Sequence, residues 1–208
     1  MKRLLPIALL FLPAWLATAA AEEIVAEQLD RLLRGEAVLL DTESDAAGGA
    51  ARVQILVHGP ARAVWEVITS CELAFVFVDG IQTCEVLEDS GDRAVVHQVV
   101  KKGWPVPTQD FKFESLRDPY EEIRFALIEG NLKAMEGSWR FVEIQEGLLV
   151  DYRIRVEPGV PAPRFMVRRN IRKGMPDLAA CIRGLAGGSG SEAMKAEDLD
   201  RCPGEPQR

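Results

Sequence analysis

The sequence predicts an α+β fold in which one long C-terminal helix covers one face of a curved antiparallel sheet. Short segments of alternating apolar residues end repeatedly in turn sequences, as strands joined by hairpins do. One interruption, at residues 60–78, has helical spacing instead. From Pro163 to Leu185 the apolar residues again recur at steps of three and four, which puts them on one helix face. These observations indicate a sheet covered by a helix.

The first 21 residues have the features of a secretory signal peptide. Lys2 and Arg3 precede an apolar run that ends at Leu16, and small residues follow before Glu22. The run is short for a membrane span, and an uncleaved N-terminal anchor is the alternative. We therefore expect the protein in the periplasm.

The chain after the leader is expected to begin with a helix and a hairpin. Residues 22–35 have helical spacing and end at Gly35, a residue that commonly ends helices. Strands are predicted at Ala37–Thr42 and Ala51–Val57. Residues 45–49 between them are of the types that form turns.

The main domain is expected to cover residues 36–186. Helices are predicted at Ala61–Thr69 and Leu73–Val78, and six strands follow. Because strands joined by short turns are antiparallel neighbours, these strands should form one sheet. Residues 187–208 read as a polar, loose tail. The six strands are expected at Gln82–Glu88, Arg93–Lys101, Val106–Leu116, Glu122–Ile128, Ala134–Ile144 and Leu148–Val156.

The long helix should carry a kink. Pro163 suits a first helical turn, where its missing N–H has no partner in any case. Pro176 lies inside the pattern and removes one helical hydrogen bond, and Gly174 makes bending easier. We expect the bend near residues 172–174.

Charge is distributed unevenly along the chain. The net charge is −7, and it becomes −9 without Lys2 and Arg3. Residues 162–185 carry +5, which leaves about −14 for the rest. This polarity argues against general nucleic-acid binding. The basic residues can contact an anionic membrane surface or partner, or they can form a solvated face paired with acids. They are Arg164, Arg168, Arg169, Arg172 and Lys173.

Four cysteines in an exported chain indicate disulfides rather than metal ligands. Three pairings are possible, and we favour Cys71–Cys84 and Cys181–Cys202. A buried thiol at Cys181 is the alternative. The only two histidines lie on separate predicted strands. We therefore expect no metal site, and no motif indicates a cofactor.

The segment GPARAVWEVITSCELAFVFVDGIQTCEVLE resembles the opening of START-like (SRPBCC) proteins of the polyketide cyclase/dehydrase and coenzyme Q-binding type. Pro60, Val64 and Trp65 match the helix start of that family, and Phe75 or Phe77 its buried aromatic residue. Residues 137–141 resemble its Gly-x-Trp strand. The resemblance covers about residues 36–186. It implies a helix-grip fold with an elongated cavity for an apolar ligand.

Inward rows of apolar residues are candidates for the lining of such a cavity, although they can also fill an ordinary core. Trp104, between Gly103 and Pro105, is a candidate either for the mouth of the cavity or for a cap on the sheet edge. Phe165 and Met166, at the start of the long helix, are candidates for a lid. The full set is Trp65, Phe75, Phe77, Val99, Trp104, Phe111, Phe113, Phe125, Trp139, Phe141, Tyr152, Phe165, Ile171 and Met175.

The main hypothesis for function is a monomeric carrier of a lipid-like or polycyclic apolar molecule. The resemblance also permits a cyclase or dehydratase acting on a polyketide-like substrate. In that case His97, which its parity with Val95 and Val99 places inward, should face the cavity with Tyr152 and Asp110. A third hypothesis, a protein-interaction module without a ligand, predicts a filled core.

Overall fold

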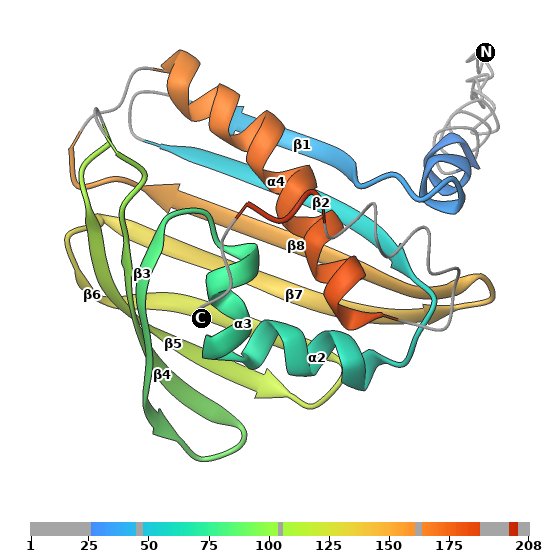
Figure 1. Ribbon diagram of the computed structural model, residues 1–208, viewed down its shortest axis with the longest axis horizontal. Coiled ribbons are helices and arrows are strands. Elements are labelled where there is room, and N and C mark those ends of the chain that lie inside the picture. Colours follow the sequence, from blue (N-terminus) through green and yellow to red (C-terminus); the bar gives the residue numbers. More distant parts are fainter. Residues whose placement is uncertain (1–25, 45–47, 104–105, 161–163, 188–199, 204–208) are drawn as a thin grey trace, which may run out of the picture.

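The computed structural model describes residues 26–44, 48–103, 106–160, 164–187 and 200–203. Eight strands form one sheet in the order β1-β2-β8-β7-β6-β5-β4-β3, and every neighbouring pair is antiparallel. Figure 1 shows the sheet curving around the helices. The strands are β1 (Val38–Ser44), β2 (Gly49–Val57), β3 (Ile81–Asp89), β4 (Arg93–Val100), β5 (Gln109–Asp118), β6 (Glu122–Gly130), β7 (Ala134–Ile144) and β8 (Gly147–Glu157).

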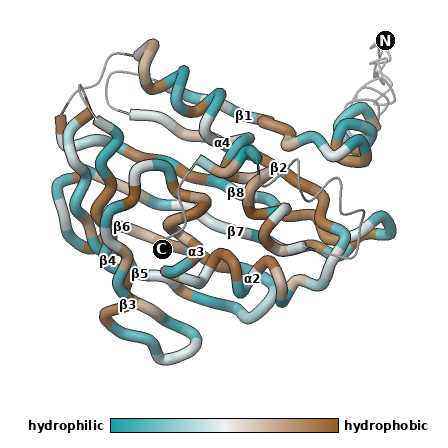
Figure 2. The backbone as a smooth tube through the Cα atoms, viewed as in Figure 1, coloured by the Kyte–Doolittle hydropathy of each residue, from teal (hydrophilic) through white to brown (hydrophobic). Residues whose placement is uncertain are grey.

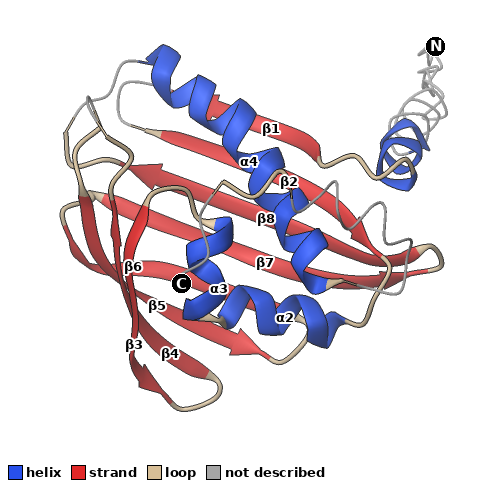
Figure 3. Ribbon diagram, in the orientation of Figure 1, coloured by secondary structure: helices blue, strands red, loops and turns tan. Residues whose placement is uncertain are grey.

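Two short helices, α2 (Ala61–Thr69) and α3 (Cys71–Phe77), interrupt the strands between β2 and β3 (Figure 3). Ser70 separates them in an extended conformation, and its hydroxyl accepts a hydrogen bond from the Leu73 amide. This is an N-cap, which satisfies one of the free amides of a new helix. Val64 of α2 and Phe77 of α3 are buried, so both helices pack on the concave face of the sheet.

The long helix α4 (Arg164–Ala186) lies across the concave face over β1 and β2. Its C-terminal half is packed on all sides, and Ala180, Cys181 and Ile182 have no exposed surface. Its N-terminal half approaches β2 at Gly49. A Cβ there would lie 2.6 Å from Ile171 Cδ1, so a larger residue at this position would make the Ile171 side chain move.

A helical segment over residues 26–33 packs on the convex face. There Leu32 meets Val38 and Leu56 in a small second core. Beside it, the buried carboxylate of Asp151 accepts hydrogen bonds from Arg52, Gln54 and Arg153. Burial alone would raise the pKa of Asp151, but these three donors outweigh it and hold that pKa below its ordinary value.

These features confirm the predicted α+β fold with a curved antiparallel sheet and a long C-terminal helix. Both predicted disulfides are also present. They join Cys71 to Cys84 and Cys181 to Cys202. Disulfides persist outside the cytoplasm, so they support an extracytoplasmic protein. No helix in the described part of the chain is long and apolar enough to span a membrane. The predicted signal peptide and most of the polar tail lie outside the described residues.

The helix α4 continues through Pro176 from Arg164 to Ala186. A proline at this position cannot donate a hydrogen bond to the Arg172 carbonyl. The expected bend near residues 172–174 stays a prediction.

Replacing glycine by alanine should have opposite effects on the free energy of unfolding at Gly137 and at Gly174. A Cβ on Gly137 would lie 2.3 Å from both the Phe125 ring and the Arg153 carbonyl oxygen. Gly137→Ala should therefore cost about 1–3 kcal/mol of unfolding free energy through overpacking. A Cβ on Gly174 meets nothing within 4 Å. Gly174→Ala, inside a helix, should stabilise by about 0.5–1 kcal/mol. Denaturant unfolding of both variants measures this, and equal changes would contradict it.

Candidate functional site

A cavity of about 1130 Å³ lies between the concave face of the sheet and the helices α3 and α4. Sheet residues from every strand from β2 to β8 line it, and the N-terminal half of α4 forms one wall. Pockets for small apolar ligands are concave, mostly apolar and of about 300–1,000 Å³. This cavity is therefore large enough for a ligand of lipid size.

The floor of the cavity is a continuous row of aromatic rings. Phe111, Phe113, Phe125 and Tyr152 follow one another with ring centroids 6.1–6.4 Å apart. Tyr152 then stacks on Trp139 at 3.7 Å and an interplanar angle of 9°. The Phe125 ring lies over Gly137, its partner across β6 and β7. Such a floor offers flat apolar faces to a ligand.

The exposed residues of the described cavity lining gather at one end of the cavity. The exposed lining residues all come from the connections at that end, from α4 or from the tail. Lys102 and Asp79, 3.6 Å apart, pair across this opening. We call the following set the mouth: Asp79, Lys102, Pro107, Thr108, Asn131, Gly159, Val160, Arg169, Asn170, Lys173 and Pro203.

The short segment of residues 200–203 is fastened beside the mouth. Arg201 donates from both Nε and Nη2 to Asp177 Oδ1 of α4, at 3.1 and 2.8 Å. The disulfide from Cys202 to Cys181 holds the same segment, and Pro203 lines the cavity. Figure 1 shows this segment in dark red beside the middle of α4.

Arg117 places one cation in the lining of the cavity, far from the mouth. Its side chain is 8% exposed, and Nη1 donates to Asp89 Oδ2 at 2.9 Å. The pKa of Asp89 lies below its ordinary value because it accepts from the Gly91 amide and from Arg117. Arg117 Nε is buried and has no hydrogen-bond partner in the described part of the chain. Donor capacity therefore remains at this end.

Arg117 is a site residue that sequence reasoning missed. The alternation that marks Phe111 and Phe113 as inward continues along β5 to Ser115 and Arg117, and both line the cavity. Continuing this alternation from Phe113 to the next two inward positions would have identified Ser115 and Arg117 from the sequence. Met135 and Ile154 also line the cavity and were not among the candidates.

Tyr152 adds a buried hydroxyl to the floor. Burial raises the pKa of Tyr152 well above its ordinary value, so the phenol stays protonated. In this form it can donate a hydrogen bond to a ligand but cannot act as a base near neutral pH.

The structure brings eight of the fourteen predicted lining residues together around the cavity. That they bind a ligand stays a prediction. Trp104 lies outside the described residues. The eight are Phe77, Phe111, Phe113, Phe125, Trp139, Tyr152, Ile171 and Met175.

The other five predicted lining residues do not face the cavity. Trp65 instead packs against Tyr120 and Phe141, with centroids 5.5 and 6.0 Å away, where α2 meets the sheet. Phe75 is partly buried against the core and is not among the lining residues. Phe165 points into solvent with 72% exposure, because it lies in the first turn of α4 beyond the sheet.

Val99 and His97 were assigned to the wrong face of β4. The lining residues of this strand are Val96, Gln98 and Val100. Valines occur on both faces of β4, so its apolar alternation does not distinguish inside from outside. His97 Nε2 instead lies 2.8 Å from Asp110 Oδ1 on the convex face. Neither His97 nor Asp110 lines the cavity, so the two groups do not meet Tyr152 there.

The predicted membrane-contact residues lie on one exposed stretch of α4. Arg168, Arg169, Arg172 and Lys173 are exposed, and nothing is described of the Arg164 side chain. Arg169 and Lys173 also belong to the mouth. The basic stretch and the cavity opening are therefore adjacent.

Comparison with known proteins points to one family. Residues 57–183 match the family described as polyketide cyclase/dehydrase and lipid transport. No curated protein sequence matches the chain.

Several solved structures share the fold. A STAR-related lipid transfer protein from Xanthomonas axonopodis is 13% identical with a TM-score of 0.57, and the match covers 71% of this chain and 99% of that one. An aromatase/cyclase from Streptomyces sp. R1128 is 20% identical with a TM-score of 0.55, covering 69% and 96%. A protein from Thermus thermophilus is also 20% identical, with a TM-score of 0.55 and coverage of 68% and 99%. At these identities the likeness shows the fold alone.

The burial of Tyr152 predicts that its phenol resists alkaline titration in the folded protein. Because burial raises the pKa of Tyr152 well above its ordinary value, Tyr152→Phe should leave the tyrosine absorbance change on raising the pH unchanged while the protein stays folded. Ultraviolet absorbance measures this change. A smaller absorbance change in Tyr152→Phe than in the unchanged protein would contradict the buried placement.

Proposed function

The chain belongs to the polyketide cyclase/dehydrase and lipid transport family, and we propose that it is a carrier for a lipid-like or polycyclic apolar molecule. The observation that supports this most is the cavity of about 1130 Å³ with an aromatic floor. The ligand lies between the sheet and α4. It enters through the mouth, where the exposed lining residues gather.

Burial of the ligand supplies the driving force. Each Å² of apolar ligand surface removed from water contributes about 25 cal/mol, so about 300 Å² contributes roughly 7 kcal/mol before the costs of association. No bond needs to form or break for such binding. A carrier therefore requires only the shape and the apolar lining of the cavity.

The alternatives have less support. A cyclase or dehydratase needs acid–base groups that converge on the substrate, and His97 and Asp110 lie on the opposite face from Tyr152. A ligand-free interaction module predicts a filled core, whereas the described chain encloses a cavity. Both points favour the carrier.

The proposed compartment is the periplasm, with the carrier acting as a monomer. Two disulfides support an oxidising compartment, and the predicted signal peptide supplies the route. The mass of the exported protein tests the route, because cleavage after Ala21 would leave a chain that begins at Glu22.

Filling the cavity should abolish ligand binding while the fold is kept. Ile154 lines the cavity, and its cross-strand neighbours are the small residues Ala51 and Gly137. Ile154→Trp should therefore occupy ligand space. Binding is measured with the neutral apolar fluorophore N-phenyl-1-naphthylamine, and native mass spectrometry with organic extraction identifies any co-purified ligand. We expect at least about a tenfold loss of affinity for the fluorophore.

The matched control is Val142→Trp. Val142 is 40% exposed and lies outside the cavity lining. The control should bind the fluorophore like the unchanged protein, and thermal unfolding verifies that both variants fold. Equal binding by the unchanged protein and Ile154→Trp, or no binding by either, would rule out the cavity as a carrier site.

Arg117 refines the proposed ligand class. A buried cation with spare donor capacity favours a ligand whose far end carries an anionic or strongly accepting oxygen. Arg117→Gln should weaken binding of the anionic probe 11-(dansylamino)undecanoate about tenfold, because one charged hydrogen bond is lost. Binding of neutral N-phenyl-1-naphthylamine should change little. Equal losses for the two probes would indicate a structural role only.

A further inference from the structure

We infer that the exposed face of the N-terminal half of α4 docks onto an anionic lipid bilayer, with the mouth of the cavity turned toward it. The inference rests on the proposed carrier function and names its partner. The docking surface consists of Phe165, Arg168, Arg169, Arg172 and Lys173.

The first support is unpaired charge. Outside the docking surface, the arginines whose side chains the structure describes form ion pairs with carboxylates. Arg183 is the exception in this group, and it too has an interaction. Arg168, Arg169 and Arg172 have no such partner in the described part of the chain. The described residues therefore do not form the alternative arrangement, in which acidic side chains pair with this basic face.

The nearest carboxylate on the same helix is already engaged. Asp177 lies one turn after Lys173, where it could pair with that lysine. Arg201 from the C-terminal segment instead takes both hydrogen bonds to Asp177 Oδ1. Lys173 is therefore not paired with Asp177, and its ammonium group can pair with an external anionic partner.

An exposed aromatic ring accompanies the charges. Phe165 is 72% exposed, the most exposed large apolar residue of the described chain. It precedes Arg168 by three positions and Arg172 by seven, so all three lie on the same face of α4. Figure 2 shows hydrophilic colour along this half of α4, with a hydrophobic colour at its first turn. Basic residues with an adjacent aromatic ring suit the headgroup region of a membrane.

The position of the cavity favours a bilayer over an acidic protein. Arg169 and Lys173 belong both to the docking surface and to the mouth. Val160, which is 50% exposed, lies at the mouth as well. An apolar ligand dissolves in a membrane far better than in water. A mouth held against the bilayer lets the ligand pass without crossing water.

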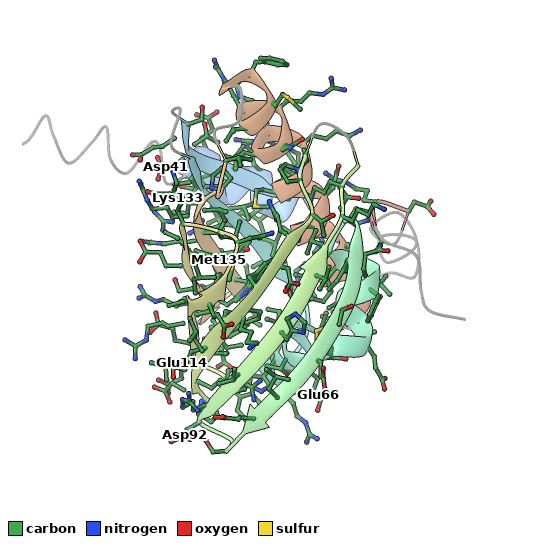
Figure 4. All side chains as sticks on the ribbon, turned by 90° about the vertical axis from the view of Figure 1, so that its left-hand side faces the viewer. Asp41, Glu66, Asp92, Glu114, Lys133 and Met135 are labelled. Atoms are coloured by element: carbon green, nitrogen blue, oxygen red, sulfur yellow. A yellow bond between two sulfur atoms is a disulfide. The ribbon has the colours of Figure 1, made fainter. Side chains whose placement is uncertain are left out.

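Because the net charge of the chain is negative, attraction to an anionic membrane has to come from the docking surface alone. The whole chain carries −7 and is repelled by an anionic membrane. On the convex face, carboxylates accompany the basic residues; Glu114, labelled in Figure 4, accepts from Arg93 at 2.6 Å. Docking through α4 turns the rest of the chain, which carries the net negative charge, away from the lipid. The attraction should therefore weaken with salt.

The test is flotation of the purified, leader-free protein with vesicles of phosphatidylcholine containing about 30% phosphatidylglycerol, and with vesicles of phosphatidylcholine alone. The protein should float with the anionic vesicles only. Arg168→Gln with Arg172→Gln, two residues outside the cavity lining, should weaken binding about thirtyfold, at about fivefold per charge. Phe165→Ser should reduce the binding that persists at high salt.

The matched control is Arg124→Gln with Arg140→Gln. These arginines are 67% and 56% exposed on the convex face and pair with Glu122. The control changes net charge equally and should keep vesicle binding within about twofold. Equal losses in the two double variants, or equal binding to neutral vesicles, would overturn the inference.

The same samples separate this inference from the carrier function. Both double variants should bind N-phenyl-1-naphthylamine like the unchanged protein. Fluorophore binding without vesicle binding would overturn the docking surface, leave the carrier intact and point to an acidic protein as its partner. Vesicle binding without fluorophore binding would overturn the carrier and leave a membrane-binding surface with no ligand to transfer.

Discussion

The cavity exists because α4 is packed on all sides along only half of its length. Its C-terminal half is enclosed, with Ala180 and Ile182 fully buried. Its N-terminal half is held mainly from one side, by the close approach of Ile171 to Gly49. One fully packed half fixes the helix on the sheet, and the other leaves space over the aromatic floor. Packing at interior density along the whole helix would leave no room for a ligand.

Covalent and ionic links hold the cavity wall in place. The disulfide Cys71–Cys84 joins the start of α3 to β3, and both of its cysteines line the cavity. Cys181–Cys202 and the pairing of Arg201 with Asp177 fasten the C-terminal segment to α4. A wall around an empty space lacks the packing contacts that stabilise a core. Cross-links compensate because they restrict the unfolded chain rather than fill the cavity.

Charge and shape together suggest how such a protein works. On the sheet, most arginines pair with carboxylates, as Arg52 does with the buried Asp151. On α4 the unpaired arginines stand beside the mouth. The family includes both lipid transport and cyclase activity, and a shared fold does not choose between them. The convex position of His97 and the open, basic mouth favour transport.

The sequence by itself determined the elements and their order, and it favoured the disulfide pairing that the structure shows. Helical and alternating periods identified α4 and the aromatic rows, since these patterns depend on local geometry alone. For β4 the period was uninformative, because valines at Val95, Val96, Val99 and Val100 satisfy both faces. Only the tertiary structure decided that Phe165 points to solvent, that His97 lies on the convex face, and that the helix leaves a space. These facts depend on how far separate elements stand apart, which no single segment encodes.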